Sequence, residues 1–139
     1  MKQNRMSIVV FSGTADKLTA VATLATGAVA MGMDVELFLT FWGLESFRTG
    51  ATTRPPRIDP AFADYAPVML ELMQAKNVPH WLDTIRAARE IGAVKILACS
   101  ATMELFSMKL EDLEDVVDEV TGVATFIERA RESEMSMFI

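Results

Sequence analysis

The sequence predicts an α/β fold in one domain, residues 1–139, built on a mostly parallel sheet of about five strands. Short runs of β-branched and aliphatic residues, typical of strands buried on both faces, occur at 6–11, 33–40 and 93–98. Helical spacing of apolar residues fills the segments between them, and such crossovers connect parallel strands. A chain of this length can bury a single core, and no linker or internal repeat divides it.

The N-terminal part predicts a βαβ unit. Strand 6–11 ends at the turn 12–14, and a helix rich in Ala, Thr and Gly follows over 16–31. The second strand, 33–40, stops at 41–43. The crossover between the two strands should be right-handed and the strands parallel.

The middle of the chain predicts a loop followed by two helices. Arg, Pro, Gly and Thr in 48–59 cannot continue a helix or a strand. Apolar residues three and four apart then predict helices over 60–76 and 79–91. Pro67 either kinks the first of these helices or lies in its first turn.

The C-terminal third predicts short elements in alternation. They are a helix at 103–108, a helical turn at 111–116, a strand at 117–120, a helix at 122–131 and a final strand at 135–139.

Composition excludes several classes of function. The net charge of −6 disfavours nucleic acid and acidic membrane surfaces as partners. The longest uncharged stretch, 18–33, is shorter than the about 20 apolar residues that span a bilayer. One cysteine cannot form an intramolecular disulfide, and no signal peptide opens the chain, so we expect a reducing cytoplasm. With one cysteine and one histidine we expect no metal, and no phosphate-loop or dinucleotide motif indicates a cofactor.

The expected ligand site lies at the carboxyl ends of the parallel strands. Turns that follow the first three strands should meet there and line one crevice. The candidate binding residues are Ser12, Gly13, Thr14, Phe41, Trp42, Gly43, Ser100, Ala101, Thr102 and Met103.

Cys99, the only cysteine, ends the strand 93–98 and is the candidate reactive residue. A helix starting near Thr102 would direct free N–H groups and its positive dipole end at the sulfur, which favours thiolate over thiol. The alternative is that Cys99 is a small buried hydrophobe, because unpaired cysteines are often buried. Both interpretations stay open at this point.

His80, the only histidine, opens the helix that leads into the Cys99 strand. Neighbouring elements are about 10 Å apart, too far for a hydrogen bond, so we expect His80 to lie at the helix cap and not to act as a base for Cys99. A thiolate without a base points to chemistry at sulfur instead of hydrolysis.

Arg48, Arg54 and Arg57 form the one basic cluster of an acidic chain. They indicate either a solvated loop or a docking site for an anion or a partner. The turn 12–14 has the same two interpretations: a plain strand-to-helix turn, or an anion cradle.

Four segments, 28–33, 38–44, 96–99 and 122–127, together resemble the DsrE/DsrF/DsrH-like family over nearly the whole chain. The resemblance implies a three-layer α/β/α fold, homo- or hetero-oligomers, and sulfur-relay proteins that carry persulfide sulfur on a cysteine, to which Cys99 corresponds. Relatives often have a Met- and Gly-rich stretch after the second strand, where this chain has the Arg- and Pro-containing loop.

The leading hypothesis is a cytoplasmic sulfur carrier or sulfurtransferase that accepts sulfur on Cys99 from a donor protein and passes it to an acceptor protein. The alternative is a non-catalytic oligomeric subunit or small-ligand-binding module with a structural Cys99. A thiol peroxidase ranks last, because no second cysteine resolves a sulfenic acid. The apolar surface of 60–91 exceeds what one side of the sheet needs and predicts a homo-oligomer.

Overall fold

A five-stranded, all-parallel sheet with the strand order β4-β3-β2-β1-β5 forms the centre of the protein. The computed structural model describes residues 1–139. The strands are β1 (Gln3–Val10), β2 (Asp34–Leu39), β3 (Val94–Cys99), β4 (Glu119–Thr121) and β5 (Ser133–Phe138). The predicted α/β class with a parallel sheet is confirmed.

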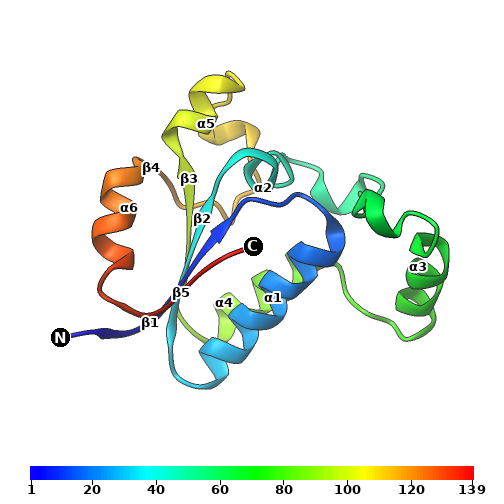
Figure 1. Cartoon of the computed structure of the whole chain (residues 1–139), viewed down its shortest axis with the longest axis horizontal. Helices are drawn as coiled ribbons and strands as arrows, with labels where there is room; N and C mark the ends of the chain where they lie inside the picture. Colours follow the sequence, from blue (N-terminus) through cyan, green and yellow to red (C-terminus); the bar gives the residue numbers. More distant parts are fainter.

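Helices cover both faces of this sheet (Figure 1). On one face α1 (Ala15–Ala30) and α4 (Trp81–Ile91) pack against each other over the main core of 27 buried residues. Small buried residues of α1, among them Ala22 and Ala25, allow this close approach. The other face carries α6 (Val123–Ala130) over a smaller cluster of four buried residues.

Two short helices follow their strands without an intervening loop. They are α2 (Phe41–Glu45), directly after β2, and α5 (Ser100–Leu105), directly after β3. The predicted stop at 41–43 is therefore helical, and the helix predicted at 103–108 begins at Ser100. In both cases the end of the strand therefore lies at the start of a helix.

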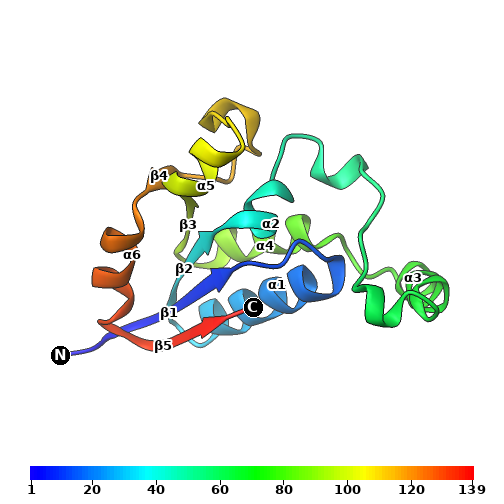
Figure 2. The same ribbon diagram turned by 45° about the horizontal axis from the view of Figure 1, so that its top comes forward.

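The helix predicted over 60–76 is shorter than expected, and of the two interpretations of Pro67 the second, a place in the first helical turn, is confirmed. A 3-10 turn at Pro60–Phe62 is separated from α3 (Ala66–Ala75), and Pro67 lies in the first turn of α3, where its missing N–H costs nothing. No residue of α3 is buried. Figures 1 and 2 both show α3 projecting away from the sheet.

Other boundaries differ from the predictions by a few residues. The first strand begins at Gln3 instead of Met6, the last begins at Ser133 instead of Met135, and the turn predicted at 111–116 is a 3-10 turn at Leu110–Asp112. No helix is long and apolar enough to cross a membrane.

Buried charges attach α6 to the sheet. Glu36 of β2 is 3% exposed and forms ion pairs with Arg5 of β1 and Arg129 of α6. Arg5 also donates to the carbonyl of Arg129, and its Nε donates to the hydroxyl of Ser133 at 3.0 Å. Because a buried charge is tolerated only with partners, this network fixes the C-terminal end of α6 against the amino half of the sheet.

Candidate functional site

Cys99 is both the last residue of β3 and the N-cap of α5. Its side chain is 6% exposed and lies on the α6 face of the sheet, in a cluster with Phe38, Leu97 and Phe126. The free N–H groups of the first turn of α5 begin immediately after it, closer than a helix starting at Thr102 would have placed them.

Hydrogen-bond donors around the thiol favour its ionised form. Burial makes the largest single contribution and acts to raise the pKa of Cys99. The hydroxyl and N–H of Thr102, the hydroxyl of Thr40 and the N–H of Ala101 act in the opposite direction. Together these donors hold the pKa of Cys99 below its ordinary value, which increases the thiolate fraction at neutral pH.

Two threonine hydroxyls from neighbouring segments meet beside the sulfur. Thr40 Oγ1 and Thr102 Oγ1 are 3.1 Å apart, and the N–H of Phe41 donates to Thr102 Oγ1 at 3.1 Å. Each hydroxyl has one proton, and their mutual hydrogen bond uses only one of the two. The other proton is not used between the two threonines, and hydrogen bonding by both side chains acts to lower the pKa of Cys99.

The turn between β2 and α2 is strained where it contacts this pair. Phe41 has a φ of 46°, in the left-handed region that side chains other than glycine rarely adopt. Its hydrogen bond to Thr102 helps to hold that conformation, and its ring lies 41% exposed against the ring of Phe11. Thr102 therefore joins the ends of β2 and β3.

A stacked aromatic pair packs in the buried cluster that contains the thiol. The rings of Phe38 and Phe126 lie 4.4 Å apart and nearly parallel, with Phe126 contributed by α6. Both side chains pack in the same cluster as Cys99. Ser100 and Ala101, which follow the cysteine, are exposed and provide the open side of the site.

The predicted single crevice was wrong. A cavity of about 690 Å³ at the carboxyl edge is lined by Ser12, Gly13, Thr14 and Trp42, but not by Cys99 or any residue of α5. The reason is strand alternation. Ala98 belongs to the main core on the α1 and α4 face, so Cys99, one residue later, lies on the α6 face.

Two glycines among the predicted binding residues allow close approach of backbones. A Cβ on Gly43 would lie 2.1 Å from the carbonyl oxygen of Val10, and one on Gly13 would lie 2.6 Å from that of Trp42. Ser12 and Thr14 share a hydroxyl hydrogen bond of 3.1 Å across the turn between them.

Met103 is also not placed as we predicted. Its side chain is 5% exposed and belongs to the main core, on the opposite side of the sheet from Cys99.

His80 is the N-cap of α4, as the sequence predicted. Its Nδ1 accepts the N–H of Leu82 at 3.1 Å, and the residue lines the cavity. Burial lowers its pKa, and Asp83 and Glu114 oppose this effect only in part.

Thr40 was missed by the sequence analysis. It directly follows β2, the strand that pairs with β3, so the rule that selected Cys99 as a strand-end residue also applied to it. The sequence analysis placed Thr40 as the last residue of the second strand and took candidate residues only from the segment 41–43 after it.

The fold and the thiol define a class of protein: a parallel α/β domain whose lone cysteine joins a buried strand to a helix start. The chain belongs to the DsrE/DsrF/DrsH-like family, whose model matches residues 2–63 and 58–138.

Two curated relatives match over nearly their whole lengths. The uncharacterized protein YrkE of Bacillus subtilis (strain 168) is 32% identical, covering 97% of this chain and 96% of its own. The sulfur carrier protein DsrE2 of Allochromatium vinosum is 28% identical over 100% of both chains.

Two solved structures share the fold at 16% identity. They are the protein of unknown function MTH1491 from Methanobacterium thermoautotrophicum, with a TM-score of 0.62 over 99% of this chain and 100% of that one, and the ychN protein from E. coli, with a TM-score of 0.58 over 100% of both.

Proposed function

We propose that this protein is a sulfur carrier that holds sulfane sulfur as a persulfide on Cys99 and passes it to a partner thiol. The observation that carries the proposal is the thiol at the β3–α5 junction, whose pKa is lowered by Thr102, Thr40 and Ala101 against the effect of burial. Membership of the family and the likeness to a protein named as a sulfur carrier support the same function.

The transfer needs no cofactor and no external redox reagent. The Cys99 thiolate attacks the terminal sulfur of a donor persulfide, the donor S–S bond breaks, and the donor leaves as a thiolate. Cys99 then carries the persulfide Cys99–S–S⁻. In the second half an acceptor thiolate attacks the same terminal sulfur, and Cys99 leaves as a thiolate with its electron pair.

The donors that stabilise the thiolate also suit the persulfide. An S–S bond is about 2 Å long, so the terminal sulfur stays near the donors that surround Cys99 Sγ. Hydrogen bonds to a charged acceptor are stronger than those between neutral groups. Ser100 and Ala101 form the exposed side, from which a donor persulfide would approach.

Intact-mass measurement after incubation with a polysulfide donor tests this function. The wild-type protein should gain the mass of one sulfur atom, a reducing thiol should remove it, and Cys99→Ser should gain nothing. A wild-type mass that stays unchanged under conditions that load a known carrier would count against the proposal.

A second function, a ligand-binding module with a structural Cys99, is favoured by one observation. The thiol is 6% exposed among aromatic rings and lies outside the large cavity. Alkylation separates the two. Modification of the folded protein at neutral pH supports the carrier, and a thiol that is silent until denaturation supports the module.

We also propose that the protein acts in a reducing compartment, as a free thiol requires, and that it forms a homo-oligomer. Several apolar side chains on α3 and just before it are exposed. They are Phe62 (61%), Tyr65 (61%), Val68 (45%) and Leu72 (48%). Apolar surface of this kind usually marks an interface.

A further inference from the structure

The cavity at the carboxyl edge of the sheet is separate from the thiol, and its lining has a chemistry of its own. We propose that it binds a small organic dianion: a flat apolar group that carries a phosphate or two carboxylates.

The charged residues that line the cavity are mostly basic, which favours an anionic ligand. Lys17, Arg48, Arg54 and Arg57 line the cavity with only one carboxylate, that of Glu45. Glu45 is paired with Arg48 at 2.8 Å, and Lys17 is paired with Asp59 at 3.2 Å. Two guanidinium groups are left without a carboxylate, in a chain whose net charge is −6.

The two uncompensated arginines are held in different ways. Arg54 donates to the carbonyl oxygens of Thr49, Ser46 and Arg48 at 2.9 to 3.1 Å, so it is oriented but not neutralised. The carbonyl of Arg57 accepts the N–H of Ala15 at 2.7 Å, which ties its backbone to the start of α1. The guanidinium of Arg57 itself makes no hydrogen bond or ion pair with the chain and is free for a ligand.

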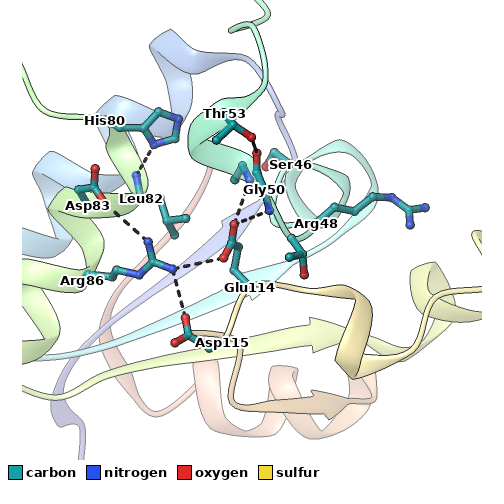
Figure 3. Close-up of polar contacts among 12 residues, drawn as sticks. Ser46, Arg48, Gly50, Thr53, His80, Leu82, Asp83, Arg86, Glu114 and Asp115 are labelled. Carbon is teal, nitrogen blue, oxygen red and sulfur yellow. Dashed lines mark hydrogen bonds and ion pairs between the residues drawn. The ribbon is translucent and has the colours of Figure 1, made fainter.

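The segment 49–51, between Arg48 and Arg54, is anchored by hydrogen bonds within the chain before any ligand binds. Glu114 accepts the N–H groups of Gly50 and Ala51, both at 2.9 Å, and also binds Arg86 of α4 at 3.2 Å (Figure 3). Thr49 adds a hydrogen bond from its N–H to Asp112. A preformed wall reduces the ordering cost of binding.

Neutral donors and flat surfaces complete the site. The backbone N–H groups of Gly13 and Lys17 have no acceptor within the chain. Since Nδ1 of His80 accepts a hydrogen bond, its Nε2 carries the proton of the neutral ring and is a further donor. Trp42 and Trp81 supply flat apolar surface, and about 690 Å³ has room for an organic body beyond the oxyanion.

Tryptophan fluorescence reports on this cavity alone, because the chain has two tryptophans and both line it. The probes are phenyl phosphate, phthalate, benzyl alcohol and inorganic phosphate. Phenyl phosphate or phthalate, or both, should saturate the fluorescence signal and bind about tenfold more tightly than benzyl alcohol or inorganic phosphate. The tighter of the two identifies phosphate or dicarboxylate as the group recognised.

Arg57→Gln is the variant to compare, because its side chain is exposed and makes no hydrogen bond or ion pair in the folded protein. It should weaken binding of the organic dianion about tenfold with an unchanged melting temperature. The matched control is Arg131→Gln, which removes the same charge from an exposed arginine after α6 that does not line the cavity. The proposal is overturned if neither dianion saturates the signal, if benzyl alcohol binds as tightly, or if both variants behave alike.

Discussion

Thr40 Oγ1 and Thr102 Oγ1 lie 3.1 Å apart, one hydroxyl from the end of β2 and the other from the first turn of α5. Both lower the pKa of Cys99, which lies in the adjacent strand end. Parallel pairing places the ends of β2 and β3 side by side. A thiolate can therefore be stabilised here by neutral groups alone, without a histidine or a cation.

Thr102→Val should raise the pKa of Cys99, because it removes a hydroxyl donor that the thiolate uses, and hydrogen bonds to charged groups contribute about 1.5–3 kcal/mol. The pH midpoint of alkylation by iodoacetamide measures this. Thr102→Ser keeps the hydroxyl and is the control, with a midpoint close to that of the wild type.

The same Thr102→Val change should also destabilise the fold by about 1–3 kcal/mol, because the N–H of Phe41 loses its acceptor. Urea unfolding measures the loss. In the alkylation experiment, equal pH midpoints for Thr102→Val and Thr102→Ser would show that the hydroxyl does not act on the thiol.

Phe126→Leu should speed alkylation of Cys99 without changing its pH midpoint. The substitution removes one ring of the aromatic pair that packs in the same cluster as the thiol but touches none of its donors. At a pH well above the midpoint Cys99 is fully ionised, so alkylation rates measured there report only how accessible the thiol is. Phe47→Leu, a fully buried change in the main core, is the control for general loosening. An equal increase in alkylation rate in both variants would contradict a local role of Phe126 in covering the thiol.

Burial of His80 should make stability depend on pH. Its pKa is lowered in the folded protein, so between that folded value and the unfolded value of about 6.5 the unfolded chain binds more protons. This contribution to stability is complete above pH 6.5 and is lost as pH falls through the folded pKa. His80→Asn, which keeps a capping side chain, should flatten the slope in urea unfolding curves.

The same His80→Asn variant should leave the alkylation midpoint of Cys99 nearly unchanged, since the donors that lower the pKa of the thiol are Thr102, Thr40 and Ala101. A large upward shift of the midpoint would instead show a thiolate–imidazolium pair and would make hydrolytic chemistry a serious alternative.

Light scattering at micromolar concentration should give a mass above the 15.3 kDa monomer. Val68→Glu should shift it to the monomer, because Val68 is 45% exposed on a helix with no buried residue. Gln74→Glu adds the same charge to another face of α3 and should keep the oligomer. A clean monomer mass for the wild type would refute self-association through this surface.

The sequence predicted the central strands and α1 to within a few residues because buried aliphatic runs and helical spacing are strong local signals. The helix predicted over 60–76 begins only at Ala66 although the apolar spacing before it is also helical, and no residue of α3 is buried in this chain. Periodicity shows that a face is apolar; it does not show what covers that face.

The prediction of the candidate site was wrong in one respect, for a similar reason. Position at a strand end predicted that Cys99 lies at the carboxyl edge, and it does. Because β3 is buried on both faces, its sequence lacks the alternation that would assign Ala98 and Cys99 to opposite sides. The thiol and the cavity were therefore predicted to share one crevice, whereas Cys99 does not line the cavity.

The most direct test of the sulfur-carrier account follows one labelled sulfur through a complete cycle. The protein is loaded from a polysulfide that carries heavy-isotope sulfur, freed of donor, and mixed with an acceptor thiol while intact mass is recorded. The account predicts that label enters only when Cys99 is present, then leaves for the acceptor and restores the original mass. Label that enters Cys99→Ser, or label on the wild type that no thiol removes, would contradict it.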